Sequence, residues 1–192
     1  MVSGTTLKAI VRHYRSNARL RDRAKEDAWW RAKGEPLDEA IDRAACARTP
    51  WGRYSHQHRQ SAAVLAECAR RLQAIGKELA SCTSFHDLFL RVERTLKDIR
   101  GVGELVIYDT ADRIGHYLGL APDRVYLHRG TREGAAALGL RQGDQTISVK
   151  QLPEELQVLS NREAEDVLCT YKSWIVRDQA LARSDEHANG GR

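Results

Sequence analysis

Gly101 and Gly103 lie between two helix-forming segments, in the stretch LKDIRGVGELVIYDTADRIG that runs from Leu96 to Gly115. Glycine adopts left-handed backbone conformations and lets another group approach the main chain closely. Because the second segment begins directly after Gly103, the N–H groups of its first turn and the positive end of its dipole should face outward. With Arg100 beside it, this corner is predicted to bind one phosphate of a nucleic-acid backbone. A tight turn that only joins two helices is the alternative.

A second group of reactive side chains lies in VYLHRGTREGAAALGL, residues 125–140. Tyr126 supplies a ring that can stack on a base, and His128 an imidazole that can donate or accept a proton near neutral pH. Arg129 and Arg132 supply guanidinium groups for phosphate. We predict that these residues form the rim of a pocket. The alternatives are solvent-facing arginines and a His128 that is simply hydrogen-bonded within a loop.

Asp109 is the carboxylate best placed for acid–base chemistry, since it follows the glycine corner on the same predicted helix and shares a polar face with Tyr108. A carboxylate can activate a water or stabilise developing positive charge. An acid that is exposed or ion-paired on a helix surface is the alternative, and the rival acids are Asp98, Asp112 and Asp123. Tyr171 and Lys172, late in the last predicted helix, could face the same cleft as the residues of the predicted pocket rim.

Composition bounds the fold class and the partners. A chain of 192 residues with 42% hydrophobic content can bury one core of ordinary size, and few prolines with recurrent Ala, Leu and Arg favour helices. The formal charge is +5, and nine Lys or Arg against three acids fall between residues 8 and 33. Because basic surfaces attract phosphate backbones, this end of the chain could bind a nucleic acid, and a simply solvated helix is the alternative.

The spacing of the cysteines indicates whether the chain could bind a metal, and the apolar runs indicate where in the cell it is expected. Cys46, Cys68, Cys82 and Cys169 form no C-x-x-C pair, and no His stands at zinc-ligand spacing from a cysteine pair. We therefore predict no metal and no iron–sulfur cluster. The first ten residues lack the apolar segment of a signal peptide, and no run approaches the roughly 18 apolar residues of a membrane span. The expected location is a reducing cytoplasm without a membrane partner.

Helices are the elements that must position these side chains. Hydrophobic spacing and capping residues predict helices over Thr6–Lys33, Leu37–Ala47, Gln57–Leu79, Phe85–Ile99, Glu104–Leu118, Arg132–Leu138 and from the Ser160 cap to Ala180. A loop that gathers aromatic and histidine side chains is predicted over residues 49–60, and a short extended piece over Ile147–Val149. We expect one all-α domain over residues 1–180, with a basic N-terminal helical segment (1–34), a core (84–140) and a flexible tail (181–192).

The glycine corner resembles the helix-hairpin-helix motif of DNA-binding proteins, and the resemblance implies DNA, in double-stranded form, as the partner. The segment that follows, with Thr131, Arg132 and a closing Leu-Gly-Leu at residues 138–140, is similar to the one that follows the hairpin in the helix-hairpin-helix superfamily of DNA glycosylases. The likeness covers about residues 85–140. It implies a helical bundle of two lobes and a monofunctional glycosylase that flips an altered base and hydrolyses its N-glycosidic bond.

The resemblance also implies roles for the candidate residues. Asp109 and His128 would be catalytic; the phosphate-binding set would be Gly101, Gly103, Arg100, Arg129 and Arg132; the base pocket would hold Tyr108, Tyr126, Tyr171 and Lys172. A monovalent cation at the hairpin is implied, and no other cofactor. A looser likeness, carried by motifs such as YDTA-x-RIG and Cys-x-Tyr-Lys (residues 169–172), is to small bacterial proteins. It makes a hypermodified base of phage DNA, and hence antiviral defence, one candidate for the substrate and the role.

Two departures from the family leave other functions open. The family places a catalytic Asp where this chain has Leu127 or His128, and residues 104–120 contain no lysine for a Schiff-base lyase mechanism. A non-catalytic helix-hairpin-helix DNA-binding protein is therefore the alternative function. A helical adaptor that uses its tryptophans for protein contacts is a third, and those residues are Trp29, Trp30, Trp51 and Trp174.

Overall fold

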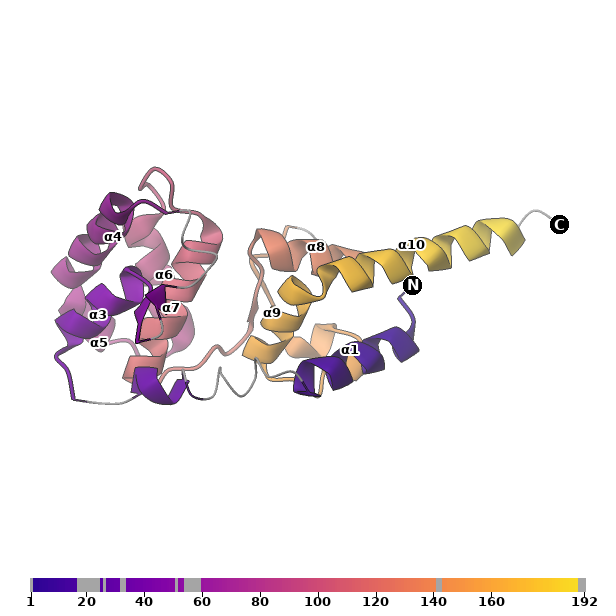
Figure 1. The fold of residues 1–192 in the computed structure, drawn as a ribbon, viewed down its shortest axis with the longest axis horizontal. Helices are drawn as coiled ribbons and strands as arrows, with labels where there is room; N and C mark the ends of the chain where they lie inside the picture. The colour runs from indigo at the N-terminus through magenta and orange to yellow at the C-terminus, as the bar shows by residue number, and fades with distance from the viewer. Residues whose placement is uncertain are drawn as a thin grey trace. The chain divides into compact units, whose positions relative to one another are not determined.

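The computed structural model describes residues 2–16, 25, 27–31, 34–50, 52–53, 60–140 and 143–189. Over these residues the chain is mostly helical, with four two-residue strands, which confirms the all-α class (Figure 1). Most of the loop predicted over residues 49–60, with Trp51, Tyr54, His56, His58 and Arg59, lies outside the described residues. Among the described residues no helix is both long enough and apolar enough to cross a membrane.

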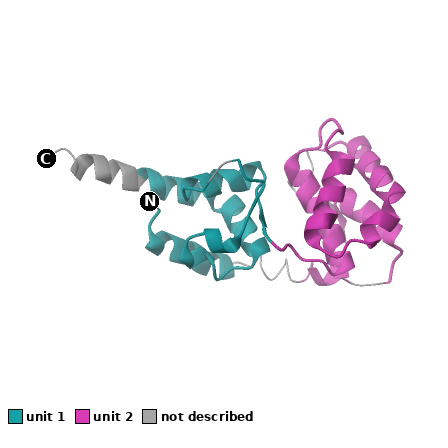
Figure 2. Ribbon diagram, turned by 180° about the vertical axis from the view of Figure 1, so that it is seen from behind, with its two compact units in different colours: residues 1–23, 124–192 teal, residues 24–123 magenta. Residues whose placement is uncertain are grey.

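The chain divides into two compact units, coloured separately in Figure 2. Unit 1 comprises residues 1–23 and 124–192, and unit 2 comprises residues 24–123. The sequence predicts one domain with two lobes. The stretch that resembles the glycosylases is divided between these units, because the glycine corner belongs to unit 2 and the VYLHRGT segment to unit 1.

Unit 2 is a helical cluster. Its elements are α3 (Leu37–Ala45), the antiparallel strands β1 (Arg48–Thr49) and β2 (Gly52–Arg53), α4 (Ala62–Ala74), α5 (Gly76–Ala80), α6 (Phe85–Leu96) and α7 (Glu104–Leu118). Helix α6 buries residues at three- and four-residue spacing, among them Phe85, Leu88, Val92 and Leu96, and this apolar stripe packs against α7. Ser84 caps α6 by accepting the Asp87 N–H at 3.1 Å.

The helix after the glycine corner has the predicted bounds. Helix α7 begins after Gly103 and ends at Gly119, whose φ of 76° is the left-handed conformation that favours glycine at a helix end. The Leu120 N–H then bonds back to the Gly115 carbonyl at 2.7 Å. A Cβ at Gly115 would lie 2.8 Å from the Leu120 carbonyl oxygen and 3.0 Å from the Phe85 ring, so a glycine permits this close packing.

The single long helix predicted over Gln57–Leu79 is wrong. The described part forms two helices, α4 and α5, which meet at Ile75, where the backbone leaves the helical region (φ −111°, ψ 21°). Gly76 follows the break, and α3 packs closely there. A Cβ at Gly76 would lie 3.3 Å from a carboxylate oxygen of Asp38, and the Gln73 amide donates to the Asp38 carbonyl at 3.0 Å.

Unit 1 surrounds its own core. Its elements are α1 (Gly4–Ser16), β3 (Val125–Tyr126), α8 (Arg129–Ala137), β4 (Thr146–Ile147), the 3-10 turns η2 (Val149–Gln151) and η3 (Glu154–Leu156), α9 (Asn161–Thr170) and α10 (Lys172–Asn189). Strands β3 and β4 pair antiparallel, with Val125 opposite Ile147. The predicted extended piece, Ile147–Val149, overlaps β4, whereas β3 lies outside the segments predicted to be extended. The core gathers apolar residues from every helix of the unit.

Several predicted helix ends in unit 1 differ from the structure. Helix α8 begins at Arg129, three residues early, because the His128 ring caps it and accepts the Gly130 N–H at 3.3 Å. The predicted capping box of Ser160 and Glu163 is confirmed at the start of α9. The last predicted helix is interrupted at Tyr171, and α10 continues past Ala180 to Asn189. In the predicted N-terminal helix, residues 17–24 lie outside the described part.

Candidate functional site

The α6–α7 corner, residues 97–104, is an exposed turn of main chain. Gly101 has a φ of 97°, which side chains resist, and Ile99 beside it is buried and anchors the turn. Gly103 is the N-cap of α7 in an extended conformation, with no side-chain hydrogen bond to cap the first turn. No atom lies within 4 Å of the position that a Cβ on Gly103 would occupy. The predicted corner is therefore present and open to a ligand on the Gly103 side.

Charged residues around the corner divide into two kinds. Asp98 is engaged, because Arg71 on α4 binds both of its oxygens at 2.9 and 3.0 Å and holds its pKa below the usual range. This pair fastens the turn to α4. Arg100 is exposed and adds positive charge to the corner, whereas Glu104, in the first turn of α7, places a negative charge at the same helix end.

The resemblance implies a monovalent cation at this corner. Such an ion needs several oxygen ligands, which here would be main-chain carbonyls. The Ile99 carbonyl already accepts the Val102 N–H at 3.0 Å, and the Gly103 carbonyl accepts the Ile107 N–H at 3.2 Å. Each carbonyl oxygen keeps a second lone pair, so these bonds do not test the cation, which stays a prediction.

Asp109 and Tyr108 lie on α7 in unit 2. Asp109 is 17% exposed and pairs with Arg113 at 3.6 Å, one helical turn later, and Arg113 also donates to the Ala44 carbonyl on α3. Tyr108 is buried, and its ring meets Phe85 edge-on with centroids 6.3 Å apart. Asp109 thus pairs with an arginine that joins α7 to α3, and Tyr108 belongs to the core. Their predicted catalytic and base-pocket roles stay predictions.

In unit 1, two helices approach each other closely and bring together side chains that are far apart in the sequence. A Cβ at Gly134 on α8 would clash with the Leu168 carbonyl oxygen on α9. A side chain at this position would therefore force the two helices apart. The approach places His128, at the start of α8, beside the face of α9 that carries Glu165 and Cys169.

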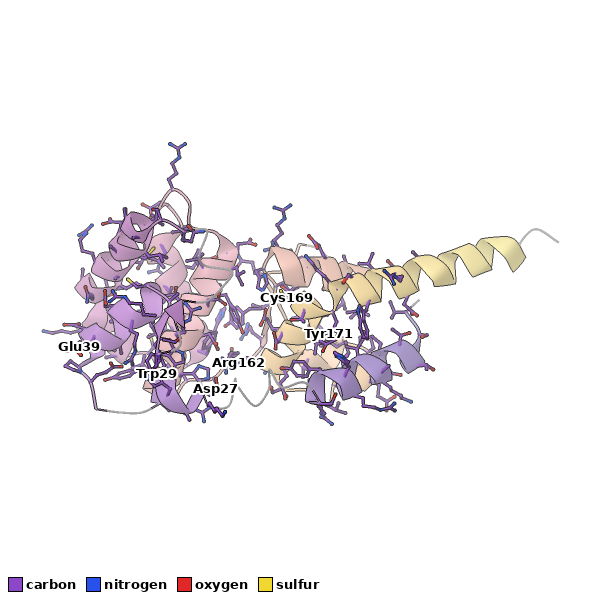
Figure 3. All side chains as sticks on the ribbon, viewed as in Figure 1. Asp27, Trp29, Glu39, Arg162, Cys169 and Tyr171 are labelled. Atoms are coloured by element: carbon purple, nitrogen blue, oxygen red, sulfur yellow. The ribbon has the colours of Figure 1, made fainter. Side chains whose placement is uncertain are left out.

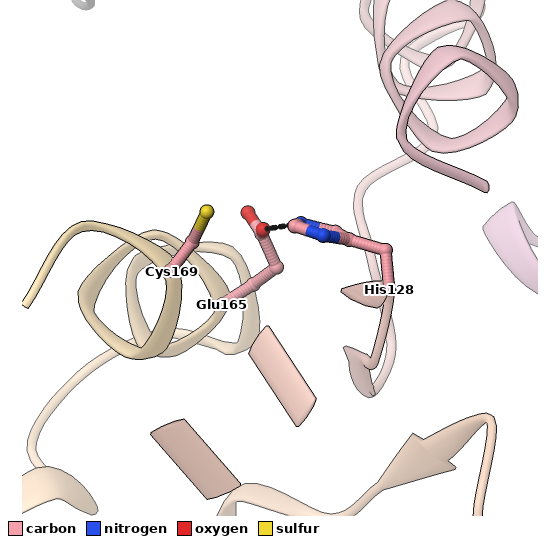
Figure 4. A group of neighbouring side chains, drawn as sticks. All are labelled: His128, Glu165 and Cys169. Atoms are coloured by element: carbon pink, nitrogen blue, oxygen red, sulfur yellow. Dashed lines mark hydrogen bonds and ion pairs between the residues drawn. The ribbon is translucent and has the colours of Figure 1, made fainter. Parts of the chain in front are cut away.

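His128, Glu165 and Cys169 form a group that we call the His–Glu–Cys cluster (Figure 4). The His128 Nε2 atom lies 2.7 Å from the Glu165 Oε1 atom, and one ligand atom from each of the three residues lies within 4.8 Å of the others. His128 and Glu165 are 4% and 5% exposed, and Cys169 is half-buried. Since Nδ1 accepts the Gly130 N–H, the neutral ring carries its proton on Nε2 and donates it to the carboxylate.

The protonation of His128 reflects two opposing influences. Burial lowers its pKa, because the charged ring is removed from water. Hydrogen bonds with Cys169 and with the Glu165 carboxylate, together with the negative charge of the latter, outweigh burial and raise the pKa of His128 to about 9. A doubly protonated ring has no free acceptor, so the Gly130 N–H bond at Nδ1 belongs to the neutral ring and opposes this rise.

The other predicted site residues of unit 1 lie around α8, α9 and α10. Tyr126 is buried on β3, and Arg129 is exposed at the start of α8. Tyr171 is also buried, and its hydroxyl lies 2.8 Å from the His13 Nδ1 atom on α1. Figure 3 shows Cys169 and Tyr171 near the junction of α9 and α10. Lys172 pairs with Glu133 at 2.6 Å.

These placements show which predicted site residues the structure groups. His128 is joined by two residues that the sequence reasoning did not select, whereas Asp109 belongs to the other unit. Arg132 is half-buried on α8, one turn from Arg129. The predicted catalytic and phosphate-binding residues are thus distributed over both compact units.

A basic surface on α1 completes the candidate features of unit 1. Lys8, Arg12 and Arg15 line an open hollow of about 570 Å³ together with Glu155 and Val158. Arg15 donates to the Val158 carbonyl at 3.0 Å. These residues belong to the basic N-terminal segment, and their exposed cations can contact phosphate without a specific geometry.

Sequence reasoning missed Glu165 and gave Cys169 no chemical role. The available signal was a pair, Glu165 and Cys169, spaced four residues apart on one face of a helix. The prediction of no metal rested on the absence of a C-x-x-C pair, which a glutamate and a cysteine on one helix do not form. A helical pair of this spacing needs a third residue from elsewhere, and His128 lies 37 residues before Glu165.

Comparison of the chain with protein-family models, with curated proteins and with solved structures found no match.

Proposed function

We propose that this chain binds DNA through the main-chain N–H groups of the α6–α7 corner. The observation that carries the proposal is the exposed Gly103 at the N-cap of α7, which has no side-chain cap and open space where a side chain would stand. A phosphate oxygen can approach such a helix end closely and is attracted by its dipole. Contacts of this kind hold the DNA backbone and do not read its bases.

Charge around the corner gives the proposal a distinctive signature. Arg100 is exposed and would add one ionic contact with phosphate, whose loss reduces the salt dependence of binding. Glu104 acts in the opposite direction, because its carboxylate lies at the helix end where the phosphate would bind. Removing that negative charge should strengthen binding.

The overall charge of +5 and the basic α1 surface also favour DNA as the partner. The expected cytoplasmic location suits the four cysteines, which are all free.

The test is duplex binding measured by fluorescence anisotropy over a range of salt concentrations. We expect Gly103→Val to weaken binding about tenfold on duplexes of unrelated sequence, because the added side chain covers the helix end. Arg100→Ala should lower the slope of log affinity against log salt by about 1. Glu104→Gln should raise the affinity a few-fold.

Gly143→Val is the matched control, because Gly143 is also exposed with no atom near its missing Cβ, but lies far along the chain in unit 1. It should bind as the wild type does. Unchanged binding in both Gly103→Val and Glu104→Gln would exclude the corner as the phosphate site.

Base excision is the second candidate, and the position of Asp109 favours it. Asp109 lies on the helix that follows the corner, and its carboxylate retains some exposure while Tyr108 and Thr110 beside it are buried. Incubation with duplexes that carry damaged or hypermodified bases, followed by mass spectrometry, would detect a released base. Asp109→Asn should leave duplex binding intact and abolish release. Release that survives this substitution would exclude Asp109 as the catalytic acid.

A further inference from the structure

We propose that His128, Glu165 and Cys169 bind one zinc ion in unit 1, with the fourth ligand position open to solvent. The starting observation is that one imidazole nitrogen, one carboxylate oxygen and one sulfur, from two different helices, lie within 4.8 Å of one another. Two of the three side chains are buried, which fixes the direction from which they approach a common centre. The proposal is independent of DNA binding at the α6–α7 corner.

The distances suit a tetrahedral ion after small side-chain movements. Zinc bonds of about 2.3 Å to sulfur and about 2.0–2.2 Å to nitrogen and oxygen place ligand atoms about 3.3–3.6 Å apart. The sulfur would therefore move inward by about 1 Å, which is within the reach of a rotation about side-chain bonds. His128 and Glu165, now 2.7 Å apart, would separate by about half an ångström as the ion binds between them. The neutral ring would then carry its proton on Nδ1, and the hydrogen bond from the Gly130 N–H would be given up.

The donor set selects the metal. A thiolate, an imidazole and a carboxylate together form a mixed set of intermediate softness, which zinc accepts and which magnesium and calcium, as oxygen-seeking ions, do not. Three protein ligands with a fourth position for water are the arrangement of zinc sites that polarise a bound water. Cys169 and Gly130 are half-buried, so solvent reaches this side of the cluster.

Gly130 keeps the space at the cluster open. A Cβ at this position would lie 3.1 Å from the Cys169 sulfur and 3.4 Å from the His128 Cε1 atom. Any side chain there would crowd both prospective ligands. The glycine thus clears the approach between the thiol and the imidazole, and a methyl group added at Gly130 offers a way to obstruct the ion without removing a ligand.

The first test measures metal binding by the whole chain after treatment with a chelator. Zinc chloride is titrated against a competing chromogenic chelator, and cobalt chloride is used as a spectroscopic probe. We expect one ion per chain and a thiolate-to-cobalt charge-transfer band in the near ultraviolet. Cys169→Ser and His128→Gln should each lower the zinc affinity at least about 100-fold, and Cys169→Ser should abolish the band. Gly130→Ala should weaken binding with all three ligands present.

Cys68→Ala is the matched control, because it removes a buried cysteine outside the cluster and should leave one zinc ion per chain.

A second measurement needs no variant, so it does not depend on whether the substituted chains fold. Cys169 is half-buried while the other three cysteines are buried, so an alkylating reagent should modify Cys169 first. Zinc should protect it, as read by peptide mass spectrometry. The proposal is overturned if no stoichiometric zinc binds, if Cys169→Ser retains the cobalt band, or if zinc leaves alkylation unchanged.

Discussion

Each compact unit buries a histidine beside carboxylates, and the two differ in what else surrounds the ring. In unit 2, His116 on α7 donates from Nδ1 to the Asp112 carbonyl at 2.7 Å, and its Nε2 atom lies 3.2 Å from Asp27. In unit 1, His128 accepts a main-chain N–H at Nδ1 and bonds to Glu165 through Nε2. The two rings therefore carry the proton of their neutral forms on opposite nitrogens.

The comparison shows that a buried histidine with an acidic partner does not by itself mark a functional site. Around His116 the contacts are with aspartates and a helix carbonyl, an arrangement that orients the ring within the packing of unit 2. Around His128 a thiol stands within reach, and Gly130 leaves room between thiol and ring. The sulfur and the cleared space, rather than burial, make the second group a candidate for metal binding.

Removing each ring should have unequal effects on stability. In metal-free protein, His128→Ala takes away the hydrogen bond of a carboxylate that is only 5% exposed, so we expect a loss of about 3–5 kcal/mol in the free energy of unfolding. His116→Ala should lose about 1–2 kcal/mol, because the Asp27 side chain, 21% exposed, can turn to water. Urea unfolding followed by circular dichroism measures both.

The double variant His128→Ala with Glu165→Gln is the control for this comparison. Replacing the carboxylate with a neutral amide removes the buried charge, so the double variant should recover part of the stability lost in His128→Ala. Equal losses for the two single variants would contradict the contrast between the two histidines.

The close approach of α8 and α9 provides a second comparison. Gly134→Ala should destabilise the protein by about 3 kcal/mol, because the new methyl group meets main chain that cannot move aside. Gly115→Ala in unit 2 should destabilise to a similar extent, because its Cβ would lie 2.8 Å from the Leu120 carbonyl oxygen. Only Gly134→Ala should also change the alkylation rate of Cys169, since it displaces the helix that carries the cluster. Similar alkylation rates in both variants would show that α8–α9 spacing does not hold the cluster together.

The pH dependence of stability should reveal the His128–Glu165 pair in metal-free protein. The folded pKa of His128, about 9, lies above the ordinary value of 6.5, so the folded state holds the proton more tightly. The stabilisation is fully present below about pH 6.5 and is lost as the pH rises through 9. It should be on the order of 3 kcal/mol, because each pKa unit corresponds to about 1.4 kcal/mol. The difference in unfolding free energy between wild type and His128→Gln should therefore shrink between pH 6 and pH 10, and a constant difference would argue against the raised pKa.

Local features of this protein could be predicted from neighbouring residues. The bounds of α7, the glycine corner before it and the capping box of Ser160 and Glu163 all depend on groups within a few positions of one another. Backbone conformation, capping and helical periodicity act over such distances, so sequence spacing specifies them. The all-α class follows from the sum of these local preferences.

Features that depend on distant contacts could not be predicted in this way. The break between α4 and α5 lies where Asp38 on α3 packs closely, and strand β3 exists because β4 pairs with it. The candidate metal site has the same character, since His128 reaches Glu165 and Cys169 only because Gly134 lets α8 approach α9. The sequence alone thus determined the helical class, the bounds of α7 and the cap of α9. Tertiary packing decided which side chains meet, because the close approach of two helices depends on the shapes of both surfaces.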